Sequence, residues 1–171
     1  MNPESLLNKV EDKAKYIKLS TIAGIIVILD LISKAIILTK IPLYHSIEVI
    51  PGFFNLTHIQ NAGGAFGLLA NQSSDVRDIF FIIVSSLSIC LIFLLYKNTP
   101  KTHSLLAAGF ALILGGAVGN LIDRIRFGKV IDFLDFYIGG LHWPAFNVAD
   151  SAITIGIAVF IFHILFKKMP E

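Results

Sequence analysis

Two aspartates lie where an apolar chain has little reason to carry charge. Asp132 lies in the stretch GKVIDF, and Asp150 lies in FNVADS, directly before a long apolar run. Two carboxylates that meet in a poorly solvated site do not both ionise easily, so one proton is shared between them. One group then serves as base and the other as acid. If Asp132 and Asp150 meet, we expect acid–base chemistry with an activated water.

Each neighbouring polar residue also has a structural interpretation. Asp directly before an apolar run is an ordinary helix N-cap, which would account for Asp150 alone. A cap does not account for Asn147, three residues earlier in the same small, apolar setting. Asp135 follows Asp132 by three residues, and we interpret it as a solvated loop charge. At a helix N-terminus the dipole favours an ionised carboxylate, so we expect Asp150 to be the more anionic member of the pair.

The composition places these residues in a membrane protein. Of the 171 residues, 55% are hydrophobic and 15% are charged, whereas soluble domains carry about 25% charged residues. The mean hydropathy of +0.76 agrees. The net charge of +2 is small, and the single cysteine, Cys90, excludes an intrachain disulfide. We expect one integral membrane domain over residues 1–171.

Four runs are apolar enough to cross a bilayer, which takes about 20 mostly apolar residues. They cover approximately residues 17–38, 79–96, 105–122 and 151–166, which leaves two long loops at about 40–78 and 124–149. The first run is longer than a signal-peptide core, carries two charges and lacks a clear cleavage site, so we expect it to stay as a helix.

The distribution of basic residues predicts the orientation. One side of the membrane would hold eight lysines in short segments: Lys9, Lys13, Lys15, Lys18, Lys97, Lys101, Lys167 and Lys168. The other side would hold five basic residues spread over the two longer loops: Lys40, Arg77, Arg124, Arg126 and Lys129. We therefore expect both termini in the cytoplasm and both long loops on the outside.

The outward loops carry structure of their own. Residues 44–60 combine β-branched and aromatic residues around Pro51 and Gly52, which predicts a short β-hairpin or curled sheet on the membrane. The segment NAGGAFG, from Asn61, permits close backbone approach to another group. After it, NQSSDVRDIFF indicates a capped helix start. In the second loop, Tyr137 and Trp143 fit an interfacial aromatic belt.

Ionisable groups inside membrane helices are costly, by at least about 2.5 kcal/mol at the centre, so each needs a reason. Asp30 and Lys34 are spaced i,i+4, which suits a structural ion pair or the border of a site. Gly115 and Gly119 form a small-xxx-small pair for helix packing. Four further residues share this part of the third run, and they fit either a packing face capped by charges or a site: Gly116, Asn120, Asp123 and Arg124.

Other chemistries lack their residues. The five histidines show no metal-ligand spacing, so no metal is expected. No G-x-S-x-G motif occurs, and Ser33 and Lys34 are adjacent on a helix and point apart. A proton-coupled carrier would use Asp30, Lys34, Asp132 and Asp150 as a relay deep in several helices. The sequence instead gathers its polar residues on the outward side, as an enzyme at the membrane surface would.

The motifs resemble those of the lipoprotein signal peptidases (signal peptidase II). The resemblance rests on DLISK from Asp30, NAGGAFG from Asn61, GNLIDRIRFGKVIDF from Gly119 and FNVADS from Phe146, in that order along the whole chain. Gly64 stands where alanine is more common in the family, and it keeps the position small.

The resemblance implies a bacterial inner-membrane aspartic endopeptidase that needs no cofactor. Its substrates would be prolipoproteins bearing a diacylglyceryl-cysteine, cut just before that cysteine, with membrane lipid and no nucleic acid as further partners and no need for more than a monomer. The implied fold is an all-α polytopic membrane protein with four transmembrane helices, a small extracytoplasmic β-sheet or cradle and a short interfacial helix. The implied dyad is Asp132 and Asp150. The implied supporting residues are Asp30, Lys34, Asn61, Gly116, Asn120, Asp123, Arg124 and Asn147.

Overall fold

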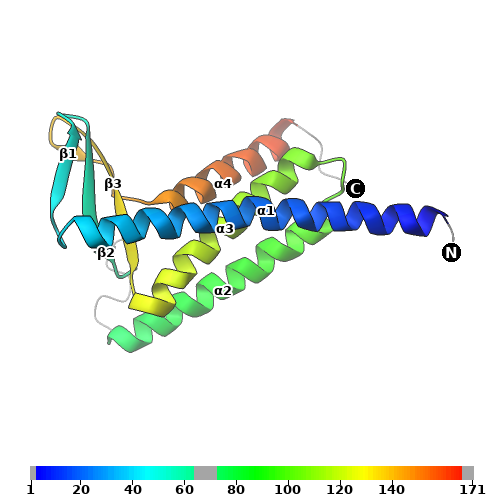
Figure 1. Cartoon of the computed structure of the whole chain (residues 1–171), viewed down its shortest axis with the longest axis horizontal. Coiled ribbons are helices and arrows are strands. Elements are labelled where there is room, and N and C mark those ends of the chain that lie inside the picture. Colours follow the sequence, from blue (N-terminus) through cyan, green and yellow to red (C-terminus); the bar gives the residue numbers. More distant parts are fainter. Residues whose placement is uncertain (1–2, 64–72, 167–171) are drawn as a thin grey trace.

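A bundle of four helices carries a small sheet at one end (Figure 1). The computed structural model describes residues 3–63 and 73–166. The helices are α1 (Pro3–Lys40), α2 (Ser74–Asn98), α3 (Ser104–Phe127) and α4 (Val148–Phe166). All four contain a stretch long and apolar enough to cross a membrane. The four expected runs therefore lie inside four helices, each of which begins or ends beyond its apolar run.

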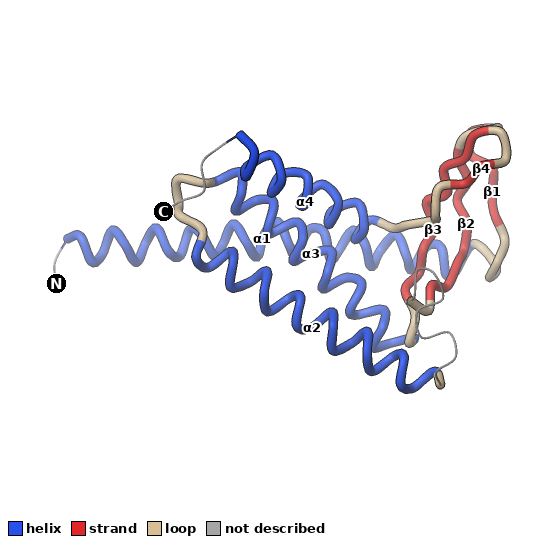
Figure 2. Tube along the Cα trace, turned by 180° about the vertical axis from the view of Figure 1, so that it is seen from behind, coloured by secondary structure: helices blue, strands red, loops and turns tan. Residues whose placement is uncertain are grey.

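Two of the helices, α1 and α3, extend beyond their expected apolar runs into polar sequence. The first turns of α1 project beyond the other helices, away from the sheet (Figures 1 and 2). α3 continues past residue 122 to Phe127, and Gly128 ends it in a left-handed conformation with φ of 66°. Arg124 and Arg126 are therefore helical and do not lie in the loop. Within residues 3–63 and 73–166 no separate short helix is present in addition to these four.

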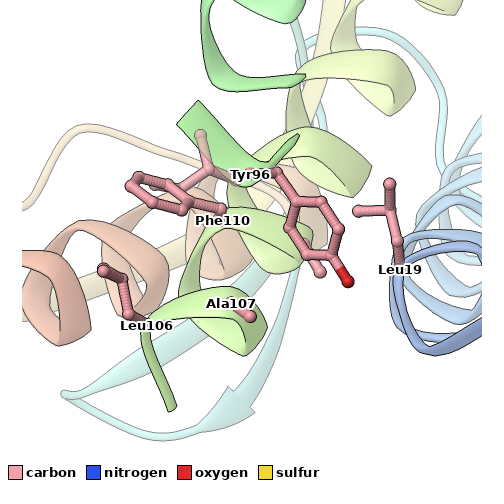
Figure 3. Close-up of a cluster of buried hydrophobic side chains, with 7 residues drawn as sticks. Leu19, Tyr96, Leu106, Ala107 and Phe110 are labelled. Atoms are coloured by element: carbon pink, nitrogen blue, oxygen red, sulfur yellow. The ribbon is translucent and has the colours of Figure 1, made fainter. Parts of the chain in front are cut away.

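α3 is the central helix of the bundle. It packs against α1, α2 and α4, and a buried apolar cluster joins it to α1 and α2 at the end away from the sheet (Figure 3). Leu19, Tyr96 and Phe110 belong to this cluster. On α1, in contrast, Ile28 and Ile32 are more than half exposed, which fits a surface turned toward lipid.

Three glycines let α3 approach its neighbours closely. A Cβ on Gly119 would lie 2.7 Å from the Asp30 carboxylate oxygen on α1. A Cβ on Gly116 would clash with the Ala149 carbonyl on α4. The expected small-residue pair of Gly115 and Gly119 faces α1, because a Cβ on Gly115 would meet the backbone of Ala23. These contacts bring the polar residues of three helices together.

The sheet combines both outward loops. It has the antiparallel order β1 (Ser46–Ile50), β2 (Phe54–Asn61), β3 (Val130–Ile138) and β4 (Leu141–His142). The first loop supplies the expected hairpin, whereas β3 and β4 come from the second loop, for which the sequence had indicated only an aromatic belt. Ile37 and Ile41 at the end of α1 pack with Ile131 and Phe133 of β3, which fixes the sheet on the bundle.

Some expectations concern residues outside the described ranges. These are Gly64 and the rest of the glycine-rich segment to Gly67, the first residues of NQSSDVRDIFF, and Lys167 and Lys168. The described part of that stretch begins at Ser73, directly before α2.

Candidate active site

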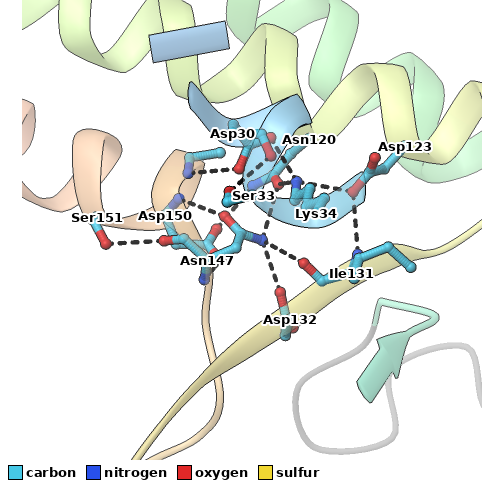
Figure 4. Close-up of polar contacts among 11 residues, drawn as sticks. Asp30, Ser33, Lys34, Asn120, Asp123, Ile131, Asp132, Asn147, Asp150 and Ser151 are labelled. Carbon is cyan, nitrogen blue, oxygen red and sulfur yellow. Dashed lines mark hydrogen bonds and ion pairs between the residues drawn. The ribbon is translucent and has the colours of Figure 1, made fainter. Parts of the chain in front are cut away.

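Polar side chains from five elements meet where the sheet joins the bundle, and Figure 4 shows those of α1, α3, β3 and α4. α1 contributes Asp30 and Lys34, α3 contributes Asn120 and Asp123, and β2 and β3 contribute Asn61 and Asp132. Asn147 and Asp150 lie at the start of α4. The structure thus brings together residues that are up to 120 positions apart in the sequence.

Asn147 and Asp150 form a reciprocal cap at the start of α4. The backbone N–H of Asp150 donates to Asn147 Oδ1 at 2.9 Å, and the backbone N–H of Asn147 donates to Asp150 Oδ2 at 3.2 Å. This is the capping-box arrangement, in which the cap residue and the third helical residue satisfy each other. The cap is therefore Asn147, and the interpretation of Asp150 as the N-cap is wrong, because Asp150 lies within the first turn.

The same asparagine connects the two aspartates. Asn147 Nδ2 donates to Asp132 Oδ1 at 2.8 Å, with the Ile131 carbonyl and Asn120 Oδ1 each at 3.2 Å. Asn147 is fully buried. A buried, hydrogen-bonded amide has one orientation, so it fixes Asp132 on β3 relative to Asp150 on α4.

Asp132 is a buried carboxyl group to which no cation among the described residues is hydrogen-bonded. Asn61 Nδ2 donates to its Oδ2 at 3.0 Å. The strand register explains this contact, since Asn61 lies opposite Val130, one pleat from Asp132 on the same face. Burial raises the pKa of Asp132 to about 7, the two amide bonds oppose the shift, and the charge of Asp150 adds to it.

Asp150 is more open than Asp132. Its Oδ1 accepts a hydrogen bond from Asn120 Nδ2 at 2.8 Å, and its Oδ2 accepts the backbone bond described above. Asp150 is partly exposed, whereas Asp132 is 3% exposed. Asp150 therefore receives an N–H donor on each of its carboxylate oxygens at the start of α4.

Lys34 lies at the centre of a buried ionic network. Its Nζ lies 2.7 Å from Asp30 Oδ2 and 2.8 Å from Asp123 Oδ2, and it donates to Asn120 Oδ1 at 3.1 Å. All three charged side chains are at most 2% exposed. The expected i,i+4 pair therefore forms, and Asp123 adds a second carboxylate to it.

The network holds both segments that carry the aspartate pair. Asp30 Oδ1 accepts the backbone N–H of Ala149 at 3.0 Å, next to Asp150. Asp123 Oδ2 accepts the backbone N–H of Ile131 at 3.1 Å, next to Asp132. Sequence reasoning missed these two backbone donors, and their position directly before each aspartate was the signal that would have identified them.

Arg124 supplies a positive charge close to the pair. Its guanidinium interacts electrostatically with Asp132 and Asp150 and lies 4.7 Å from the centre of the Phe81 ring. Its Nε and Nη1 are buried and make no hydrogen bond to any described residue. Gly116 is the remaining residue expected at the site. Because it has no side chain, α4 can lie directly against α3, and this places Asp150 next to α3.

Asp135 corrects one expectation. It is 7% exposed, and it accepts a hydrogen bond from Asn55 at 3.0 Å and pairs with His142 at 2.7 Å. The interpretation as a solvated loop charge is therefore wrong. Asp135 lies three residues from Asp132 on one strand, so the two side chains point to opposite faces of the sheet. Over residues 3–63 and 73–166, no three His, Cys, Asp or Glu side chains group as metal ligands.

Four membrane-length helices and two carboxylates that are both hydrogen-bonded by Asn147 define an integral membrane protein with a pair of aspartates at one end of its bundle. The chain matches the family model described as signal peptidase (SPase) II over residues 22–166. It is 57% identical over 155 residues to the lipoprotein signal peptidase of Desulforapulum autotrophicum, covering 91% of this chain and 96% of that one. It is 46% identical to the lipoprotein signal peptidase of Syntrophus aciditrophicus over 150 residues, 87% of this chain and 92% of that one.

Solved structures agree with the sequence relatives. A bacterial membrane enzyme structure obtained by the in meso method at 1.9 Å resolution superimposes with a TM-score of 0.77 at 34% identity, over 88% of this chain and 94% of that one. The chain belongs to the signal peptidase II family, the lipoprotein signal peptidases. It is a protease of a family that cleaves signal peptides from prolipoproteins, and its four spans fit a multi-pass protein of the bacterial inner membrane. The carrier alternative is not supported.

Proposed function

We propose that Asp132 and Asp150 are the catalytic dyad of an aspartic endopeptidase that cuts diacylglyceryl-modified prolipoproteins just before the lipidated cysteine. The observation that carries the proposal is that Asn147 bonds to both carboxylates, through its side-chain Nδ2 to Asp132 and through its backbone N–H to Asp150. Neither carboxylate forms an ion pair with a described cation within 4 Å, unlike Asp30 and Asp123. A pair of this kind is best accommodated by holding one proton between the two groups.

The surroundings assign different roles to the two aspartates. Asp132 keeps its proton near neutral pH, because burial raises its pKa to about 7. Asp150, at the start of α4 and partly exposed, is the base that takes a proton from water. The water oxygen bonds to the scissile carbonyl carbon while Asp132 donates a hydrogen bond to the carbonyl oxygen. Collapse breaks the C–N bond as a proton passes from the aspartate pair to the leaving nitrogen.

The remaining polar residues position these groups. The Lys34 network holds the backbone on the N-terminal side of each aspartate. Asn61 and Asn120 orient one aspartate each, through bonds of 3.0 and 2.8 Å. The buried Nε and Nη1 of Arg124, which bond to no described residue, offer donors for a carbonyl of the substrate. Arg124 also lowers the cost of negative charge developing at the dyad.

The site would face the outside of the inner membrane. Both termini would be cytoplasmic, because lysines are concentrated at the end of the bundle away from the sheet. The diacylglyceryl chains would remain in lipid between helices while the peptide reaches the dyad under the sheet. A single copy of the chain supplies every residue of this site, so the enzyme is proposed to act as a monomer.

The test is cleavage of a diacylglyceryl-modified prolipoprotein by purified Asp132→Asn and Asp150→Asn, with and without a chelator. We expect each variant to lose about 10²- to 10⁴-fold in turnover, the range for a general acid or base, with its melting temperature retained. The matched control is Asp135→Asn, a buried aspartate on the same strand. Near-normal turnover in either dyad variant, or inhibition by the chelator, would contradict the proposal.

A further inference from the structure

A cavity of about 530 Å³ lies at the end of the bundle opposite the aspartates, between α1 and the turn that joins α2 to α3. Basic side chains line it from both sides. Lys15 and Lys18 come from α1, and Lys101 comes from the turn. The proposed peptidase site uses none of them.

Two of the lysines are held in place by uncharged groups. Lys15 Nζ donates to the carbonyls of Lys97 at 2.8 Å and Thr99 at 2.6 Å. Lys18 Nζ donates to the Ser104 carbonyl at 3.1 Å and to its hydroxyl at 2.6 Å. These bonds fix the two ammonium groups at the cavity. The Asp12 carboxylate beside them, which is 62% exposed, pairs with Lys101 at 3.0 Å and interacts electrostatically with Lys15.

The start of α3 adds a second source of positive potential. α3 is 24 residues long, and its N-cap residue, His103, makes no side-chain capping bond. Ser104, the first residue of the helix, lines the cavity. A helix N-terminus has exposed N–H groups and the positive end of the dipole, so it favours an anion beside it. The lysines and the helix start therefore select the same kind of ligand.

The position of the cavity identifies the source of that anion. The apolar run of α1 begins at about residue 17 and α3 begins at Ser104, so Lys15 and Lys18 lie at the border of the apolar part of the bundle, the level expected for lipid headgroups. Tyr96 and Ala107 provide an apolar wall beside the lysines. Basic pockets between membrane helices at this level bind acidic headgroups. We propose that this cavity binds the phosphodiester headgroup of an acidic phospholipid, with Lys15 and Lys18 on the phosphate and Lys101 at the rim.

Such a lipid would connect α1 to the turn between α2 and α3. Lys15 already joins these elements through the last carbonyls of α2, and the hydroxyl of the buried Tyr96 donates to the Lys15 carbonyl at 2.6 Å. A phosphate beside Lys15 and Lys18 would reduce the repulsion between their charges. The bound lipid should therefore raise the melting temperature of the protein, independently of any substrate.

The test is native mass spectrometry of the purified protein titrated with phosphatidylglycerol or phosphatidylcholine, with melting temperatures measured in parallel. We expect one phosphatidylglycerol to bind more tightly than phosphatidylcholine and to raise the melting temperature. The variant Lys18→Gln with Lys101→Gln should bind phosphatidylglycerol on the order of tenfold more weakly, since each lysine near an acidic headgroup contributes to binding.

The matched control is Lys13→Gln with Lys97→Gln, which removes two charges from the same end but not from the cavity lining. An equal loss in this control would overturn the proposal, because it would show only a general attraction between charges. Equal binding of the two lipids by the unaltered protein would also overturn it, whether or not the variants fold. Displacement of phosphatidylglycerol by excess inorganic phosphate at equal affinity would assign the cavity to free phosphate.

Discussion

The molecule contains two buried acidic groups that differ in how their charge is compensated. Around Lys34, two carboxylates share one ammonium at 2.7 and 2.8 Å. A few residues away, Asp132 and Asp150 are hydrogen-bonded by amides and backbone N–H groups. Buried charges are stable when they are paired, and amides compensate a negative charge only partly. The Lys34 group therefore has the properties of a structural element, and the Asp132–Asp150 pair those of a group prepared to exchange a proton.

The comparison also explains how the two groups depend on each other. Each carboxylate of the Lys34 group uses one oxygen for a backbone N–H next to a dyad aspartate. The ion-paired group therefore holds in place a pair of aspartates that form no ion pair with a described cation. It does so through backbone bonds that do not involve the carboxylate oxygens of Asp132 and Asp150. Damage to the first group should reduce stability, whereas damage to the second should reduce turnover.

The largest expected effect is on stability, from Lys34→Met. It removes the cation and leaves Asp30 and Asp123 buried without compensation, which typically costs 3–5 kcal/mol. We expect the melting temperature to fall by roughly 10 °C or more, measured by thermal unfolding in detergent. The control is Lys40→Met at the exposed end of α1, which should melt like the unaltered protein. A Lys34 variant of normal stability would show that the network is not a structural element.

The next effect separates positioning from capping at one residue, Asn147. Serine caps helices about as well as asparagine but has no amide for Asp132. We expect Asn147→Ser to keep its melting temperature within a few degrees and to lose about 10²-fold in turnover, because small displacements at a reacting centre are costly. Asn147→Ala should lose the cap as well, at a cost of about 1 kcal/mol. Full activity of the serine variant would show that turnover does not require the side-chain amide of Asn147.

Much of this arrangement was readable from the sequence, and the exceptions have physical reasons. The four spans follow from hydrophobicity alone, and the Asp30–Lys34 pair follows from helical spacing. The association of β3 with the first loop was missed, because VIDFLDFYI is buried on both faces over its first half and shows no clean alternation. Asp123 as the second partner of Lys34 depends on how α1 packs on α3, which no local pattern encodes. The interpretation of Asp135 as a loop residue was wrong because its partners, Asn55 on β2 and His142 on β4, are brought to it only by the pairing of the strands. No local pattern in the sequence shows that pairing.

A smaller effect is the pH dependence of stability in Asp132→Asn. Burial raises the pKa of Asp132 from 3.8 to about 7, so the folded chain holds a proton that the unfolded chain releases. The stability of the unaltered protein should therefore fall as the pH rises between these two values, and the asparagine variant should lack this part of the fall. Melting temperatures at about pH 5 and about pH 8 should show the variant gaining relative to the unaltered protein. A constant difference across this range would contradict a raised pKa.

The smallest expected effect on turnover is at Asp135, which sharpens the comparison because it resembles Asp132 in everything except its partners. Both aspartates are buried on β3, and both accept a bond of 3.0 Å from an asparagine of β2. Asp135 meets His142 at 2.7 Å, so a potential cation is available to it, whereas Asp132 meets a second amide and Asp150. Asp135→Asn should therefore change turnover less than about tenfold, while Asp132→Asn loses at least about 10²-fold. Equal losses would mean that burial of a carboxylate in this sheet, and not the absence of a compensating cation, is what turnover requires.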